Sequence, residues 1–318
     1  MAVPSVTLNN GNKVPMVGLG TWKSKPGEVG QAVRTALSIG VRHIDCAYNY
    51  GNEGEIGEAI KEKLQDGTVK REDLVVTSKL WNGFHEKERV REGFERSLKL
   101  LQLDYLDVFL IHWPVALKYT PDYDSQFPRD DEGKLICIEA DYLDTWREME
   151  KLVDEGLVKT IGVSNFNSKQ IQRIIDNCKI PPALLQVEVH PFNPSFKLVE
   201  FANSKNIAVV AYSPFASPDR AWAKPTDPNV FKSEEIQAIA KKLDKSIAQI
   251  ALRYLVQRGI LVIPKSVSEG HMSNNMDLFG FTLSKEDMDA LNNIPTKYKA
   301  CPGVVWAHSS YFPFNEEF

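Results

Sequence analysis

Short apolar runs alternate with longer amphipathic stretches along almost the whole chain. Runs such as 108–111 and 208–211 are apolar without a two-residue alternation, which is typical of parallel strands covered on both faces. We predict eight such strands, at 17–20, 42–46, 74–79, 105–112, 160–165, 184–190, 208–214 and 261–265. Repeated strand–helix units with right-handed crossovers close most simply into a (β/α)8 TIM barrel, so we expect an α/β barrel fold.

Between the strands, apolar positions recur three and four residues apart and predict helices. The predicted helices are 28–39, 55–64, 88–101, 143–154, 168–178, 196–204, 233–243, 247–257, 272–278 and 284–292. Gly40 and Gly156 stand where helices are expected to end, and Ser284 with Asp287 forms a variant of the capping box at a helix start. Asn10-Gly11 lies between two short extended runs and predicts an N-terminal β-hairpin over residues 5–16.

The length of 318 residues suggests two domains at about 150 residues each, but one barrel with decorations accounts for the whole chain. We therefore expect a single domain over residues 1–318, with long loops at 114–141 and 215–232 and a C-terminal tail at 295–318. Loops of this length are often specificity elements, although surface decoration is the alternative. A doubly wound sheet is the rival fold, but its dinucleotide site needs G-x-G-x-x-G, and only Gly18-Leu19-Gly20 is present.

Composition narrows the classes of function. Apolar residues make up 43% and charged residues 25%, and 38 Lys and Arg against 42 Asp and Glu give a net charge of −4 without a basic block. Nucleic acid is therefore not an expected partner, and no apolar run approaches the ~18 residues that span a membrane. The four cysteines form no CxxC pair and no HxxxH is present, so no metal site is expected, and we expect a cytoplasmic protein because no targeting motif is recognised.

Chemically active side chains lie at or just after the carboxyl ends of the predicted strands, where barrels hold their sites. Asp45, Tyr50, Lys79 and His112 come from three neighbouring strands. A free tyrosine titrates near 10, so as a proton donor it needs a cation such as Lys79 that favours phenolate, with Asp45 holding that cation. His112 fits as a neutral donor to a carbonyl oxygen. Each residue alone is more often a packing residue or half of a structural ion pair, but together they predict an acid–base site.

Several longer motifs share these positions. They are Val17-Gly-Leu-Gly-Thr-Trp22, Arg42-His-Ile-Asp-Cys-Ala-Tyr-Asn-Tyr50, Ser78-Lys79-Leu80-Trp81, Leu110-Ile-His-Trp-Pro114, Ile161-Gly-Val-Ser-Asn-Phe166, Ala211-Tyr-Ser-Pro214 and Ile263-Pro-Lys-Ser266. Through them the chain resembles the aldo-keto reductase family, in its aldose-reductase-like branch, over its entire length. The resemblance implies a monomeric oxidoreductase in which NADPH, with NADH accepted more weakly, reduces a small-molecule aldehyde or ketone. Tyr50 would be the general acid, supported by Lys79 and Asp45, and His112 would orient the carbonyl.

The resemblance also assigns residues to the cofactor. It implies Ser164, Asn165 and Gln186 on the nicotinamide carboxamide, Tyr212 stacked on its ring, and Gly20, Thr21, Trp22 and Asp45 along the ribose. Further residues are expected over the pyrophosphate and around the adenosine 2′-phosphate: Ser213, Phe215, Ser217, Asp219, Lys265, Ser266, Val267, Ser268, His271 and Asn275. For Ser164-Asn165 the structural alternative is a cap for the helix at 168–178.

Tryptophans gather after strands and in the tail, and only Trp146 lies inside a predicted helix. This segregation predicts an apolar, aromatic-walled substrate cleft suited to aldehydes or ketones with hydrophobic bodies. The expected substrate-binding residues are Trp22, Tyr48, Asn49, Tyr50, Trp81, His112, Trp113, Phe127, Trp222, Cys301, Gly303 and Trp306. Sugars, lipid aldehydes and steroid-like ketones all remain open as substrates. For the Cys301 thiol, which has no cationic neighbour in the sequence pattern, we expect a packing role rather than sensitivity to oxidants.

Two departures from the aldose-reductase pattern bear on specificity. That pattern has arginine where this chain has His271 and an acidic residue where it has Asn274, so the phosphate clamp is weaker. It also has alanine and leucine at the positions of Pro302 and Gly303. The missing side chain of Gly303 is expected to widen the pocket, and the alternative is that Trp306 refills the space. One alternative function is a cofactor-binding regulatory or structural barrel with little turnover. A metal-dependent hydrolase is a third, but the sequence has no clustered metal ligands at the strand ends.

The histidine in the phosphate clamp predicts a pH effect on cofactor choice. Because an imidazole loses its charge over the range from about pH 6 to 8, the preference for NADPH over NADH should fall across that range while Lys265 keeps NADPH preferred. The ratio of kcat/KM for the two cofactors, measured with one aldehyde from pH 6 to 8, tests this. A flat ratio would remove His271 from the clamp.

Overall fold

The computed structural model describes residues 3–316 and 318, so Met1, Ala2 and Glu317 of the expected domain lie outside the described residues. Eight parallel strands form one sheet in the order β12-β11-β10-β9-β6-β5-β4-β3. They are β3 (Leu19–Gly20), β4 (His43–Asp45), β5 (Val75–Leu80), β6 (Val108–Ile111), β9 (Ile161–Ser164), β10 (Leu184–Glu188), β11 (Ala208–Tyr212) and β12 (Leu261–Val262). Their parallel pairing agrees with the unbroken apolar runs of the sequence.

The first and last strands of this sheet meet and close it into a barrel. Val17 pairs with Val262 and Gly20 with Lys265 in parallel bridges, and the amide of Gly20 donates to the carbonyl of Pro264 at 3.2 Å. The (β/α)8 TIM barrel is confirmed, and a doubly wound open sheet is excluded. β3 and β12, which meet at the seam, are shorter than the sequence pattern predicts. Beyond their regular parts, isolated bridges continue the pairing.

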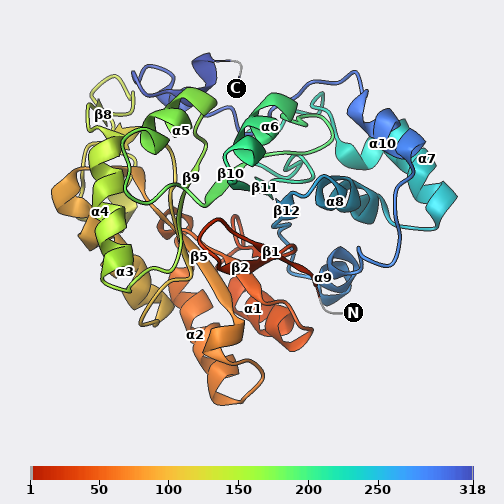
Figure 1. Ribbon diagram of the computed structural model, residues 1–318, viewed down its shortest axis with the longest axis horizontal. Coiled ribbons are helices and arrows are strands. Elements are labelled where there is room, and N and C mark those ends of the chain that lie inside the picture. The colour runs from red at the N-terminus through yellow and green to blue at the C-terminus, as the bar shows by residue number, and fades with distance from the viewer. Residues whose placement is uncertain (1–2, 317) are drawn as a thin grey trace.

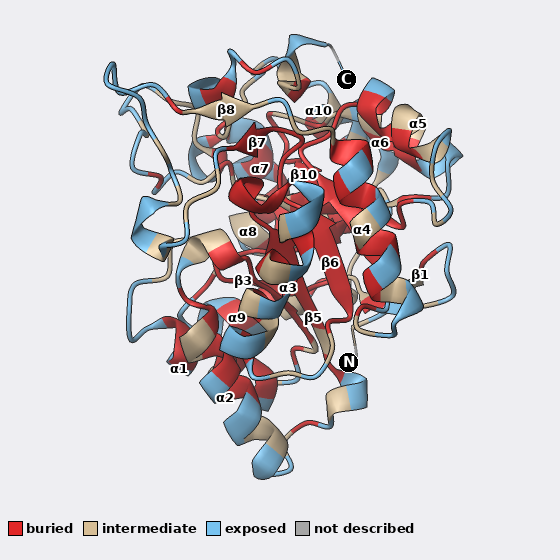
Figure 2. Cartoon of the chain, turned by 90° about the vertical axis from the view of Figure 1, so that its left-hand side faces the viewer, coloured by how far each residue is buried: buried red, intermediate tan, exposed pale blue. Residues whose placement is uncertain are grey.

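Helices surround the strands and cover their outer faces (Figure 1). They are α1 (Val29–Ser38), α2 (Glu53–Gln65), α3 (Lys87–Leu101), α4 (Tyr142–Asp154), α5 (Ser168–Ile175), α6 (Phe196–Ser204), α7 (Glu234–Leu243), α8 (Ile247–Gln257), α9 (Glu269–Met276) and α10 (Lys285–Asn292). Figure 2 shows buried residues filling the strands and the inner stripes of the helices, with exposed residues on the outer stripes. The amphipathic pattern therefore orients each helix, although α9 begins three residues before its predicted start.

Helix ends follow the predicted signals with one exception. Gly40 and Gly156 adopt φ of +99° and +75°, which glycine reaches without strain, and Ser284 forms a capping box with Asp287. At α5 the cap is Asn167, whose side chain accepts from the amide of Gln170. The alternative that Ser164-Asn165 caps this helix is therefore wrong, and those two side chains are free for the site.

The predicted hairpin, β1 (Ser5–Thr7) and β2 (Lys13–Pro15), closes one end of the barrel. Its Leu8 and Val14 pack in one cluster with Val108, Leu184 and Leu261, which are strand residues of the barrel interior. The side chains of three hairpin asparagines also hydrogen-bond to residues that precede β9 and β10: Asn9, Asn10 and Asn12. The interior is consequently filled at this end, and any open cavity must lie at the other.

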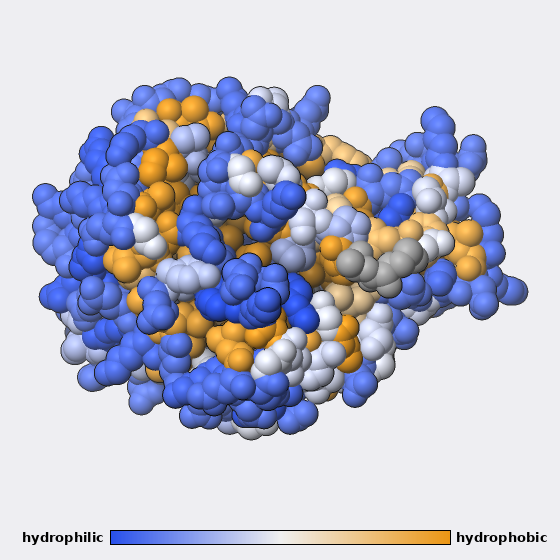
Figure 3. All heavy atoms as spheres, turned by 60° about the horizontal axis from the view of Figure 1, so that its bottom comes forward, coloured by the Kyte–Doolittle hydropathy of each residue, from blue (hydrophilic) through white to orange (hydrophobic). Residues whose placement is uncertain are grey.

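The expected long segments are partly ordered. The loop after β6 carries a small antiparallel pair, β7 (Ala116–Leu117) with β8 (Cys137–Ile138), and the loop after β11 and the tail contain short 3-10 turns. Figure 3 shows one face of the molecule, which is largely hydrophilic with scattered hydrophobic patches. Among the described residues, no helix has the length and apolar content needed to cross a bilayer.

Gly162 marks a close approach between two barrel strands. It pairs with Leu110 on one side and Leu184 on the other, and a Cβ built on it would lie 2.4 Å from the carbonyl oxygen of Leu184. Because that neighbour is main chain, it has no flexible end to move aside.

We therefore expect Gly162→Ala to lower the free energy of unfolding by about 1 to 3 kcal/mol through overpacking. Urea denaturation of both proteins measures the loss. Gly54→Ala in α2, whose Cβ would meet only Leu100 at 3.9 Å, is the control and should lose nothing. Equal stabilities of the Gly162 variant and the wild type would contradict this view of the barrel wall.

A buried carboxylate lies between α2 and the barrel. Glu53, at the start of α2, is 1% exposed and accepts from the hydroxyl of Ser78 on β5 at 2.5 Å, while its second oxygen has no partner among the described residues. Burial raises the pKa of Glu53 to about 7, and the hydrogen bond from Ser78 only partly offsets this. The folded protein therefore holds a proton here at pH values where the unfolded chain has lost it.

This raised pKa predicts a pH-dependent cost to stability. Below about pH 4.5 both states hold the proton, and as the pH rises toward 7 only the unfolded state releases it freely, so stability declines. Glu53→Gln, which keeps an oxygen for Ser78, should be about 1 to 3 kcal/mol more stable than the wild type at pH 8 and nearly equal to it at pH 4.5. Urea unfolding at both pH values measures this, with exposed Glu58→Gln as control. A gain independent of pH would refute the assignment.

Candidate active site

A cavity of about 1250 Å³ opens at the carboxyl ends of the strands, opposite the hairpin. Strand ends supply its floor through Gly20, Asp45, Ser164, Gln186 and Tyr212. The loop after β11 and the C-terminal tail supply its walls. The barrel therefore collects residues from distant parts of the sequence at one end, as the strand-end argument predicts.

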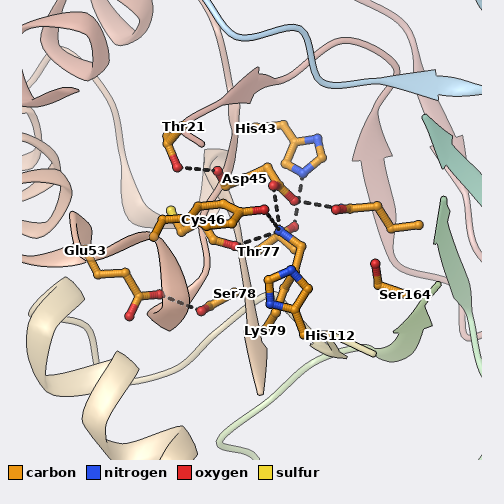
Figure 4. Close-up of polar contacts among 12 residues, drawn as sticks. Thr21, His43, Asp45, Cys46, Glu53, Thr77, Ser78, Lys79, His112 and Ser164 are labelled. Carbon is orange, nitrogen blue, oxygen red and sulfur yellow. Dashed lines mark hydrogen bonds and ion pairs between the residues drawn. The ribbon is translucent and has the colours of Figure 1, made fainter. Parts of the chain in front are cut away.

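An ion pair between Asp45 and Lys79 lies at the bottom of the site (Figure 4). The Lys79 Nζ atom donates to Asp45 Oδ1 at 2.7 Å and to the carbonyl of Cys46 at 2.8 Å, and its side chain is fully buried. The other carboxylate oxygen of Asp45 accepts from Gln186 Nε2 at 2.7 Å. Burial alone would lower the pKa of Lys79, but Asp45 and Tyr50 hold it above its usual value, so the lysine stays charged.

Tyr50 lies on the cavity wall within reach of this ammonium group. It belongs to the short 3-10 helix Tyr48–Tyr50 after β4, and its hydroxyl is 3.3 Å from Lys79 Nζ. Burial raises the pKa of Tyr50 to about 12, and the charge of Lys79 acts in the opposite direction without overcoming it. Lys79 therefore favours the phenolate as expected, but burial outweighs it in the free protein, so the phenol keeps its proton at neutral pH.

His112 completes the group. Its ring meets the rings of Tyr50 and Trp81 edge to face, with centroids 5.8 and 5.5 Å apart. Burial lowers the pKa of His112 well below its usual value, and the positive charge of Lys79 adds to the effect. A neutral imidazole beside the phenol can bind an uncharged oxygen without bringing a second cation into the site.

A row of amide and hydroxyl groups continues from the ion pair along the cavity. Asn165, which adopts φ of +62°, donates to the carbonyl of His112 at 3.0 Å and to Ser164 Oγ at 3.1 Å, and accepts from the Tyr212 hydroxyl at 2.7 Å. These bonds fix the side chains before any ligand is bound. Together with Gln186 they offer a planar ligand both donors and acceptors.

Every residue that the sequence predicts for the cofactor lines this cavity, from Gly20 at one end to Asn275 at the other. Lys265, Ser266 and His271 line the part of the cavity formed by the segments after β12. The sequence prediction did not include Lys23, which also lines the cavity and forms an ion pair with Asp219 at 2.7 Å. Lys23 directly follows Trp22 at the end of the first strand, and this position is the sequence feature that could have placed it at the cavity.

The predicted aromatic residues form the cavity walls. Trp306 packs against Trp113 and Trp81, with ring centroids 5.2 and 6.1 Å apart, while Trp81 also contacts Phe127 at 5.1 Å and Trp22 faces Trp222 at 6.1 Å. Asn49 and Cys301 also line the cavity, as predicted. These rings leave an apolar opening beside Tyr50.

Two expectations about this wall need correction. Tyr48 does not line the cavity: it is buried against Phe84 and Tyr123, and its hydroxyl accepts from Arg96 at 3.2 Å. Gly303 does not widen the pocket either.

Gly303 has φ of +61°, and a Cβ on it would meet Trp306 Nε1 at 2.8 Å and a ring carbon of Trp113 at 2.9 Å. The space left by its missing side chain is taken by these two indoles.

The cavity holds neither a reactive thiol nor, among the described residues, a cluster of metal ligands. Burial raises the pKa of the Cys301 thiol to about 12, and the carboxylate of Glu188 adds to this, which favours the packing role for the thiol. Across residues 3–316 and 318, no group of three or more His, Cys, Asp or Glu residues is placed to hold a metal ion. The donor set is instead suited to an elongated ligand with an amide-bearing ring at one end and anionic groups toward the cations.

Comparison with known proteins agrees with this geometry. The model of the Aldo/keto reductase family matches residues 16–295. The chain is 47% identical to "Aldo-keto reductase family 1 member A1" of Xenopus tropicalis over 100% of this chain and 99% of that protein, and 45% identical to the Homo sapiens protein of the same name over 94% and 91%. The solved aldose reductase of Schistosoma japonicum is 46% identical and superposes with a TM-score of 0.93, covering 99% of this chain and 100% of that one. The chain therefore belongs to the aldo/keto reductase family.

Proposed function

We propose that this protein is an NADPH-dependent reductase of aldehydes and ketones, with Tyr50 as the proton donor. The observation that carries the proposal is the phenol hydroxyl 3.3 Å from a buried ammonium group, on the wall of a cavity of about 1250 Å³. Membership of a family of carbonyl-reducing oxidoreductases supports it. A cytoplasmic location and a monomeric state, expected from sequence and resemblance, belong to the same proposal.

The residues of the cavity fit NADPH. Ser164, Asn165 and Gln186 offer hydrogen-bonding groups for a carboxamide, and the Tyr212 ring lines the cavity beside them. Among the residues after β12, Lys265 supplies positive charge for a phosphate, and the His271 imidazole and the Ser266 hydroxyl offer hydrogen bonds to it. When bound, the reduced nicotinamide supplies a hydride.

The acid–base group acts on the oxygen of the substrate. His112 and the Tyr50 hydroxyl bind the carbonyl oxygen, and as negative charge develops there, the phenol gives up its proton to it. The Lys79 ammonium group then stabilises the phenolate that remains, and Asp45 holds the lysine in place. Because Lys79 is fully buried, its charge acts on Tyr50 without screening by water.

The walls decide what enters beside Tyr50. Trp81, Trp113, Trp306 and Phe127 present apolar faces, so carbonyl compounds with hydrophobic bodies fit better than highly polar ones. A binding protein without turnover is the alternative function. Asp45, Tyr50, Lys79 and His112 lie together in the arrangement that proton transfer requires, which favours the enzyme.

Removing the phenol hydroxyl tests the proposal. Tyr50→Phe should lower kcat for aldehyde reduction by about 10² to 10⁴, which is the usual contribution of a positioned acid, and leave NADPH binding nearly unchanged. NADPH consumption is followed by absorbance and NADPH binding by fluorescence. The matched control is Tyr48→Phe, in the same short helix but outside the cavity, which should keep most of the activity. A Tyr50→Phe variant as active as the wild type would refute the proposal.

A further inference from the structure

Another buried carboxylate, outside the cavity lining, contacts the C-terminal tail. Glu188, the last residue of β10, is 3% exposed and does not line the cavity. Its Oε1 atom accepts from the amide of Ala300 at 2.6 Å and pairs with His190 Nε2 at 2.7 Å, and its Oε2 atom accepts from the amide of Cys301 at 2.7 Å. Three N–H groups thus converge on one carboxylate, which is how a buried charge is kept stable.

The same stretch of tail is held from its other side. The carbonyl of Ala300 accepts from the indole Nε1 of Trp222 at 2.9 Å, and the amide of Tyr298 donates to the carbonyl of Phe192 at 2.9 Å. Trp222 is 51% exposed, so its bond is weaker than the buried pair of bonds to Glu188. Among these attachments, Glu188 is the one that binds the amide of Cys301, the first residue of the cavity wall.

The residues that follow this attachment form a wall of the cavity. Cys301, Pro302 and Gly303 all line it, and the indoles of Trp306 and Trp113 close against Gly303 from the far side. The wall is thus fixed at one end by the carboxylate of Glu188 and at the other by indole packing. Its distance from the opposite wall depends on both.

We propose that Glu188 is a positioning residue for substrate selection, which sets the place of the wall 301–303 through the amides of Ala300 and Cys301. The inference rests on the proposed carbonyl reductase function. A bulky apolar carbonyl compound contacts this wall, whereas a short aldehyde needs only Tyr50 and His112. Loosening the attachment should therefore weaken binding of the bulky compound selectively and leave the chemical step intact.

Glu188→Gln tests this, because it keeps the shape of the side chain but replaces one acceptor oxygen by an N–H donor. With saturating NADPH, KM for a naphthaldehyde should rise by up to about tenfold, the factor expected when most of the free energy of one hydrogen bond to a charged group is lost from the wall that binds it. The kcat for this aldehyde, and KM for propanal, should change less than about twofold. Hydrogen exchange at the amides of Ala300 and Cys301 should become faster.

The chain offers a matched control in Glu150. Its Oε1 atom accepts from the amides of Lys179 and Ile180, both at 2.7 Å, so it also holds two consecutive amides, away from the cavity. Glu150→Gln should cost comparable stability without changing the ratio of the two KM values. Glu188→Asp, which keeps the charge but shortens its reach, should shift the ratio in the same direction by less, and it carries the test where the Gln variant does not fold.

Two results would overturn the inference: the same loss of kcat/KM for both aldehydes in the Glu188 variants, or unchanged exchange at Ala300 and Cys301. The proposed function fails in a different way, through a wild-type protein that oxidises no NADPH with either aldehyde. In that case the exchange measurement still reports whether Glu188 holds the wall.

Discussion

The ion pair of Asp45 and Lys79 is the constraint on which the site depends. An ammonium group has three hydrogens, and each has a partner here: the Asp45 carboxylate, the carbonyl of Cys46 and the hydroxyl of Tyr50. Asp45 in turn is held by Gln186 through its second oxygen. Because a buried charge without partners is costly, this saturation leaves the lysine one stable position and so fixes the distance to the phenol.

The barrel makes such saturation possible. In the parallel sheet, Asp45 pairs with Thr77 on one side and with Gly20 on the other. Lys79 lies two residues after Thr77 on β5. Both charged side chains therefore reach the carboxyl end of the barrel. Gln186 comes from β10, on another side of the closed sheet, and crosses the interior to meet Asp45. An open sheet would not bring these residues together. The hairpin fills the opposite end, which keeps water away from the interior below the pair.

Much of the fold and of the site could be predicted from the sequence, because both depend on patterns of apolar and polar residues that repeat within a few positions. Apolar runs predicted the strands, amphipathic repeats predicted the helices, and the residues at the carboxyl ends of the strands predicted Asp45, Lys79 and His112. The failures concern side-chain direction in irregular segments. Tyr48 and Tyr50 belong to one 3-10 turn, yet one faces the core and the other the cavity, and no repeat distinguishes them. The packing of Gly303 depends on Trp113, almost two hundred residues away, and local spacing carries no information about such a contact.

The anchoring of the tail has a consequence for how the family can vary. Beyond the cavity wall, Asn167 and Gln170, which cap α5, also bind the carbonyls of Pro313 and Tyr311 through their side-chain amides. The stretch between Cys301 and Ser310 is therefore a span with both ends tied to the barrel scaffold. Changes of sequence between these two attachments can reshape the entrance of the cavity while the strands and helices that hold both ends stay in place.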